Sequence, residues 1–222
     1  MTRGVAVEIW GDRGCFTRPE LSVERMSYDC ITPSAAVGIL ESVYWHPPMK
    51  YVIDKIHVLN PVMFMTVRTN ELKSKAQHRA MMSAMVGTGM LPHIDRRDDI
   101  QQRTSTILRD VRYVVEAHFE VSKDEMGEGD SSAKFISILK RRLAKGQCWQ
   151  QPYLGIREYA AHIRLYEGKL PPQGYYAQSG EKDLGLMLYG MDYHNPEDIT
   201  PMFYRAIMRD GTIDVAGSEV YR

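Results

Sequence analysis

Residues 101–121 read QQRTSTILRDVRYVVEAHFEV, and from about residue 106 apolar and polar positions alternate. One face is apolar and consists of Val111, Tyr113, Val115, Ala117, Phe119 and Val121. The other face is mostly polar and consists of Arg112, Val114, Glu116, His118 and Glu120. A period of two is typical of a β-strand with one buried face, so we predict a long strand over about 106–121.

The segments that precede this strand predict a shorter strand and a helix. Residues 4–10 (GVAVEIW) alternate in the same way. Thr32-Pro33 then begins a helix, because threonine is a favourable N-cap and proline fits the first helical position, where its missing N–H costs nothing. Apolar residues at helical spacing follow, and the helix is expected to end before Pro47-Pro48.

Further elements lie on both sides of the long strand. Strands are predicted at 51–58 and 62–69. Residues 71–105 have little periodicity and many charges, which predicts an inserted or mobile loop with room for one short helix. Beyond the long strand, a second main helix over 132–145 and a strand near 156–165 complete the set.

This order of elements predicts an α+β fold. We expect a ferredoxin-like (RRM-like) antiparallel sheet with two helices on one face over residues 1–168, with the insertion at about 71–105. Residues 169–222 contain several short strand-like runs separated by Gly, Pro and Asn, which predicts a small C-terminal antiparallel β extension.

The composition is that of an ordinary globular protein, with 44% apolar and 25% charged residues. No apolar run is long enough to cross a bilayer, and the first residues lack the pattern of a secretory signal. The three cysteines are widely spaced with no CxxC pair, which favours reduced thiols. We therefore expect a soluble, cytoplasmic protein.

The charges cancel over the whole chain, so no global basic field indicates a nucleic-acid partner. Locally, nine Lys/Arg against five acids lie between Arg68 and Arg112, which permits phosphate binding on one face. The sequence has no GxGxxG after a strand, no GxxxxGK[ST] and no zinc-spaced His/Cys set, so we expect neither a cofactor nor a metal. The aromatic signature of RNA-recognition modules is also missing, so base stacking on the sheet is not indicated.

Three longer stretches carry a specific resemblance: ESVYWHPPMKYVIDKIHVLNP (41–61), the long strand at 101–121, and QCWQQPYLGIREYAA (147–161). Together with the first strand and the Thr-Pro-Ser helix start, they resemble CRISPR-associated family five in its Dvulg subtype, within the RAMP superfamily. The resemblance implies a type I-C protein that cleaves CRISPR repeat RNA without a metal. It also implies that the protein stays with the guide RNA in a surveillance complex, where it contacts the backbone and large subunits.

Cleavage of RNA without a metal requires removal of the 2′-OH proton, stabilisation of charge on the phosphate and protonation of the leaving 5′-oxygen. By the resemblance, Tyr44 and His118 are the catalytic residues. The family's lysine corresponds to Ala117, which the alternation places on the apolar face. The group that replaces this lysine stays open among His46, Lys50, Lys55 and Arg112.

Each candidate also has an ordinary structural reading. Tyr44 follows a helix end, where aromatic residues often only cover the core, and His118 stands between two glutamates, where a surface ion pair would suffice. The candidates for RNA binding are Arg103, Arg109, Arg112, Arg13 and Arg18.

Two other classes of function compete with the nuclease. One is a scaffold of the same family that caps the 5′ end of the guide RNA without cutting, which the alanine at position 117 favours. The other is an unrelated metabolic enzyme on a ferredoxin-like fold, which the missing cofactor motifs disfavour.

Overall fold

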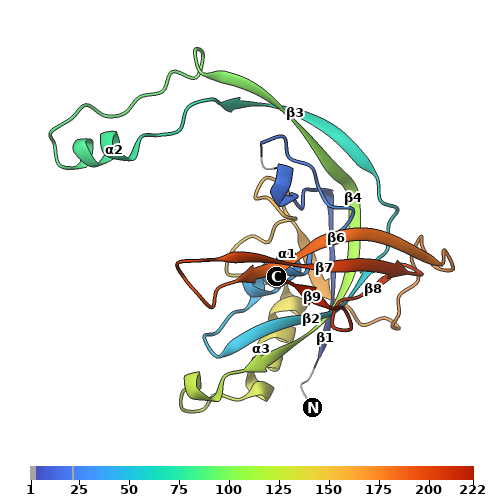
Figure 1. Ribbon diagram of the computed structural model, residues 1–222. Coiled ribbons are helices and arrows are strands. Elements are labelled where there is room, and N and C mark those ends of the chain that lie inside the picture. The colour runs from blue at the N-terminus through green and yellow to red at the C-terminus, as the bar shows by residue number, and fades with distance from the viewer. Residues whose placement is uncertain (1–3, 22) are drawn as a thin grey trace.

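The sheet is organised around β4 (Ile100–Val121) in this computed structural model, which describes residues 4–21 and 23–222 (Figure 1). β4 pairs with β1 (Val5–Gly14) on one side and with β2 (Met49–Val58) on the other. Its first half pairs with β3 (Phe64–Leu72). The predicted long strand is therefore the strand that joins most of the fold.

The other strands continue the sheet on both sides of β4, and the α-helices lie between strands in the chain. The α-helices are α1 (Pro33–Val43), α2 (His78–Met85) and α3 (Ser132–Lys145), and two short 3-10 helices lie at Pro19–Leu21 and Lys123–Glu125. The other strands are β5 (His162–Leu165), β6 (Glu181–Asp192), β7 (Thr200–Arg209), β8 (Thr212–Asp214) and β9 (Val220–Tyr221). The strand order is β5-β1-β4-β2-β8-β7-β6, with β3 beside β4 and β9 beside β7, and the named strands pair antiparallel.

The core lies on the face of the sheet that α1 and α3 cover. Val7 and Ile9 of β1 and the apolar face of β4 pack there against Ile39 and Leu40 of α1 and Leu139 of α3. A fully buried aliphatic side chain contributes about 1.5–3 kcal/mol, so this layer supplies much of the stability. The alternation seen in the sequence thus assigns the faces of both strands correctly.

The ends of both main helices follow local signals. Thr32 Oγ1 accepts a hydrogen bond from the Ala35 amide at 3.3 Å, and Pro33 occupies the first turn of α1. Ser131 caps α3 in the same way, accepting from the Lys134 amide at 3.2 Å. Gly146 ends α3 in the left-handed conformation, with φ of 63°, which glycine adopts at little cost.

The C-terminal strands continue the same sheet, because β8 pairs with both β2 and β7. Met187 and Tyr204 of β6 and β7 belong to the same core as the N-terminal elements, and α1 packs against both β2 and β6. The division into an RNA-handling domain over 1–168 and an extension over 169–222 stays a prediction.

Two parts differ from the expectation. Residues 71–105 are not a single loop, because β3 and β4 continue pairing as far as Leu72 and Ile100. They form an arm that projects from the body with α2 beyond the paired strands (Figure 1). The arm strands expose residues on both faces, so their sequence lacks a strong apolar period.

The strand predicted near 156–165 is shorter than expected and covers only His162–Leu165. Residues 153–160 form a turn instead, closed by an isolated bridge between Tyr153 and Ala160. Gly155 adopts a φ of +85° within this turn. Over the described part of the chain, no helix has the length and apolar character needed to cross a membrane.

Candidate RNA-cleavage site

The face of the sheet opposite the helices carries the polar side chains of β4. His118 lies on this face because its neighbours Ala117 and Phe119 point into the core. Across from it stands Val52 of β2, and the residue opposite Ala117 is Ile53. The predicted catalytic histidine is therefore a side chain of the open face, two residues along the strand from Glu116.

A bulge in β2 gives His118 a partner. The register shifts between Ile53 and Lys55, so Asp54 is an extra residue with no direct partner on β4. Its carboxylate oxygens lie 2.9 and 3.0 Å from His118 Nδ1. Because a carboxylate only accepts, Nδ1 donates and Nε2 is the nitrogen left for chemistry. Sequence reasoning missed Asp54, which lies 64 residues from His118.

A second histidine–carboxylate pair adjoins the first. His57 Nε2 lies 2.7 Å from Glu116 Oε1, and its Nδ1 lies 2.9 Å from Thr212 Oγ1. His57 is buried, and both ring nitrogens are occupied. His57 is therefore suited to a structural role. His118 is part-exposed, and within residues 4–21 and 23–222 its Nε2 makes no hydrogen bond or ion pair.

Tyr44 lies on the other side of the sheet, at the end of α1. Only 7% of it is exposed, and its ring packs near Phe135 at 6.4 Å between centroids. The Arg142 guanidinium lies 5.1 Å from the centre of the Tyr44 ring and donates to the Val43 carbonyl at 2.7 Å. Burial raises the pKa of the Tyr44 hydroxyl, while the positive charges of Arg142 and Lys134 act to lower it.

The structure thus places the two predicted catalytic side chains on opposite faces. In the described ranges no hydrogen bond or ion pair joins Tyr44 to His118. Ala117 is buried on the core face, as its alternation predicted. Both candidates lie near the same end of the sheet, where β2 begins at Met49 opposite Val121.

The candidates for the missing positive charge divide between the two faces. Lys50 stands opposite Glu120 and Lys55 opposite Glu116, so these lysines flank the His118 position on the open face. His46 lies on the Tyr44 side, 5.2 Å from the Phe135 ring and 3.9 Å from Asp130. Arg112 is remote from both, because its guanidinium is bound to Glu8.

Arg142 is a further cation beside Tyr44, and it was not among the candidate residues named from the sequence. The spacing of Phe135, Leu139 and Arg142 is i, i+4, i+7, which puts all three on one face of a helix. From that spacing, the sequence could have predicted that Arg142 lies on the same face of α3 as Phe135, the residue that packs near Tyr44.

The five arginines predicted to bind RNA do not form one patch. Arg13 of β1 and Arg109 of β4 are direct cross-strand neighbours, and within the described segments no ion pair neutralises either one. Arg103 belongs to the arm and lies 3.3 Å from Glu71. Arg18 covers the Tyr28 ring at 4.6 Å and lies 3.4 Å from Asp29. The Arg13–Arg109 pair is the one best suited to attract a phosphate.

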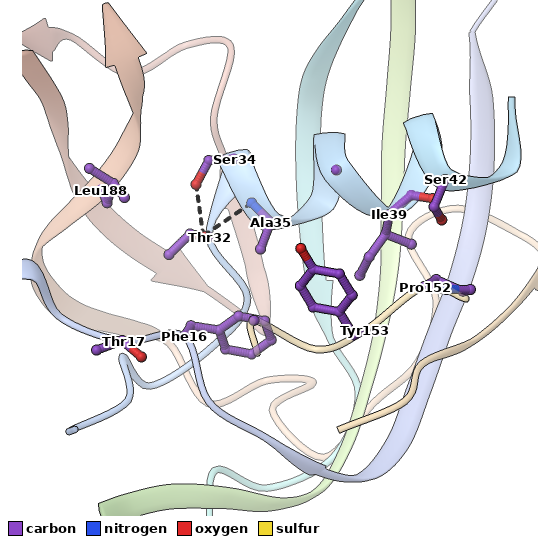
Figure 2. A pocket seen from close by; sticks show the side chains of 12 residues that line it. Phe16, Thr17, Thr32, Ser34, Ala35, Ile39, Ser42, Pro152, Tyr153 and Leu188 are labelled. Carbon is purple, nitrogen blue, oxygen red and sulfur yellow. Dashed lines mark hydrogen bonds between the residues drawn. The ribbon is translucent and has the colours of Figure 1, made fainter. Parts of the chain in front are cut away.

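A pocket of about 290 Å³ opens elsewhere, between α1 and the turn at 152–155 (Figure 2). Ser34 Oγ lies 3.1 Å from the capping hydroxyl of Thr32, and the Tyr153 ring forms one wall. Neither Tyr44 nor His118 lines it. The pocket adds nothing to the proposed chemistry.

Comparison with known proteins identifies close relatives of the whole chain. A family model described as CRISPR-associated protein (Cas_Cas5), in its Cas5d form, matches residues 4–216. The CRISPR pre-crRNA endoribonuclease Cas5d of Mannheimia succiniciproducens is 44% identical over 97% of this chain and 96% of its own. The protein of the same name from Thermus thermophilus is 34% identical over 97% and 94%. A crystal structure of a CRISPR-associated protein superposes with a TM-score of 0.70 at 22% identity, over 100% of this chain and 97% of that one.

Proposed function

The chain belongs to the Cas5d family of CRISPR-associated proteins, and from this premise we propose that it is an endoribonuclease that binds CRISPR repeat RNA and cleaves it without a metal. Relatives that match nearly the whole chain carry the name pre-crRNA endoribonuclease. The observation that carries the proposal is His118, a part-exposed histidine whose ring is oriented by a carboxylate.

The fold proposed for this activity is ferredoxin-like, with a C-terminal β extension. The strand order β5-β1-β4-β2, connected through α1 and α3, supports it, because it has the β-α-β-β-α-β order once the β3 arm is set aside. The central β4 then carries the proposed catalytic residue on the face that the helices leave open.

The proposed reaction is attack of a ribose 2′-OH on the adjacent phosphate. His118 Nε2 removes or returns a proton, and Asp54 holds the ring in the tautomer that leaves Nε2 available. Lys50 and Lys55 flank this position and balance charge that develops on the phosphate. The 5′-oxygen leaves with a proton, so the products are a 2′,3′-cyclic phosphate and a 5′-hydroxyl.

Tyr44 is proposed for the same reaction, supported by the cations beside it. Burial holds the pKa of the Tyr44 hydroxyl above its ordinary value, and the charges of Arg142 and Lys134 reduce this rise. For Tyr44 and His118 to act on one phosphodiester, the RNA must pass around the end of the sheet where β2 begins. Arg13, Arg18, Arg103, Arg109 and Arg112 are proposed to contact its phosphates.

The proposed setting is the cytoplasm, in a type I-C surveillance complex with backbone and large subunits. A second candidate function is a scaffold that caps the 5′ end of the guide RNA without cutting. Two observations favour it: Ala117 supplies no charge, and Tyr44 and His118 lie on opposite faces of the sheet.

The deciding experiment incubates the purified chain with its repeat RNA in excess EDTA, beside His118→Ala and Tyr44→Phe. Cutting at one site by the wild type, lost in His118→Ala, supports the nuclease. Binding without cutting supports the scaffold instead. An RNA with a 2′-deoxy sugar at the cut position should bind and stay intact, and cleavage of that RNA would refute the 2′-OH mechanism.

A further inference from the structure

Planar and cationic side chains gather on the open face at the β1–β5 edge. Trp10 of β1 is the direct neighbour of Arg112 on β4 and of His162 on β5. Two residues earlier on β1, Glu8 is the direct cross-strand neighbour of Val114 on β4 and of Arg164 on β5. Strand alternation puts these side chains on the same face as His118 but about 20 Å away along β4, because Arg112 and His118 are six positions apart.

The Glu8 carboxylate binds both arginines of this group. Its carboxylate is 3% exposed, and it accepts from Arg112 Nε at 2.6 Å and from Arg164 Nε at 2.6 Å, one oxygen for each guanidinium. The side chains of Arg112 and Arg164 are themselves 47% and 57% exposed. Their guanidinium planes are therefore fixed before any ligand arrives, so little side-chain entropy is lost when one binds.

Trp10 lies beside them and packs against planar groups. Its ring stacks on His162, with centroids 5.4 Å apart and planes 22° apart, and the Arg164 guanidinium lies 5.2 Å from the ring centre. A depression of about 340 Å³ adjoins Trp10 and both arginines. It is also lined by Asn60, Asp12 and Asp110, whose side chains contain hydrogen-bond acceptors.

We propose that Trp10, His162, Arg112 and Arg164 form a binding site for one unpaired nucleotide of an RNA, separate from the His118 site. Aromatic rings and guanidinium planes stack on RNA bases, and arginine also binds phosphate. The carboxylates of Asp12 and Asp110 repel a run of phosphates but accept from base amino groups, so the site suits a single base rather than a length of backbone.

This inference rests on the proposed function, because it takes RNA as the ligand. It also differs from the expectation drawn from sequence, which found no aromatic signature for stacking on the sheet. Trp10 and His162 are 152 positions apart and become neighbours only through the pairing of β1 with β5.

Its test uses the cognate repeat RNA in a His118→Ala background, in which cleavage is slow compared with the time of a binding measurement. Trp10→Ala should weaken RNA binding about 5- to 150-fold, the range for loss of one base–aromatic stack. Trp149→Ala is the matched control, since that tryptophan is 74% exposed outside the cluster, and its binding should stay within about twofold of the parent. Unchanged affinity in Trp10→Ala would overturn the site.

A second measurement keeps Trp10 in place and so does not depend on whether Trp10→Ala folds. With Trp45 and Trp149 changed to phenylalanine, the remaining indole should lose fluorescence when the RNA binds, because a stacked base quenches it. No change at saturating RNA would overturn the site even if cleavage by the wild type is normal. If the wild type neither binds nor cuts the RNA, the proposed function fails first and this inference fails with it.

Discussion

The replacement of Asp54 by asparagine tests whether His118 works as an oriented proton carrier. Asparagine has the shape of aspartate but no charge, and it can present its NH₂ group to Nδ1. The ring then loses the acceptor that selects its tautomer. We expect Asp54→Asn to bind repeat RNA as the wild type does but to cut it more slowly.

The size of the effect follows from the geometry and the exposure. A hydrogen bond to a charged group contributes about 1.5–3 kcal/mol when it is well made. The side chains of His118 and Asp54 are 25% and 32% exposed, so solvent screens the pair and about 1–2 kcal/mol remains. Applied to the transition state, this amounts to a loss of roughly 5- to 30-fold in cleavage rate.

The assay is single-turnover cleavage of labelled repeat RNA in EDTA, with affinity measured separately. The variants are Asp54→Asn, His118→Ala and the double variant. If Asp54 acts only through His118, the double variant cuts no more slowly than His118→Ala. Glu116→Gln is the matched control, because it removes a nearby carboxylate of the open face that pairs with His57 and not with His118.

Two results would refute this reasoning. Rates that multiply in the double variant would mean that Asp54 contributes independently of His118. An equal loss in Glu116→Gln would mean that any change of charge on this face slows cleavage, so that the specific Asp54 contact is not the cause.

Three further predictions concern the cation beside Tyr44, the ion pairs of Glu8 and the N-cap of α1. Arg142→Gln should slow cleavage about tenfold with unchanged RNA affinity, because it removes the cation beside Tyr44; an equal loss in the control Lys140→Gln, on an exposed part of α3, would contradict this. Glu8→Gln should lower the free energy of unfolding in urea by about 1–3 kcal/mol, and no loss at pH 7 would argue against the Arg–Glu–Arg anchor. Burial acts to raise the pKa of the Glu8 carboxyl, but bonds from Arg164 and Arg112 lower it below its ordinary value of 4.5. The stabilisation is therefore present above about pH 4.5 and is lost as the pH falls through the lower value, so wild type and variant should converge in acid. Thr32→Ala should lower the melting temperature through a loss of about 1 kcal/mol at the α1 N-cap, whereas Thr32→Ser should restore most of it.

Local chemistry accounts for the elements that were predicted well. The bounds of α3 and the start of α1 depend on capping residues next to the helix, and each such signal lies within a few positions of the residue it affects. The faces of β1 and β4 depend on alternation, which follows from strand geometry alone. The arm was missed because a two-stranded ribbon exposed on both faces has no buried period to detect.

By itself, the sequence determined the α+β class, the two main helices, the buried face of the long strand and the family resemblance, because these depend on neighbours along the chain. Only the tertiary structure decided the arrangement of the sites. The β2–β4 register and its bulge bring Asp54 to His118, and the β1–β5 pairing brings Trp10 to His162. The position of Tyr44 across the sheet depends in turn on how α1 and α3 pack. Contacts between distant residues depend on strand register and helix packing. Neither can be predicted from the local pattern of side chains along the chain.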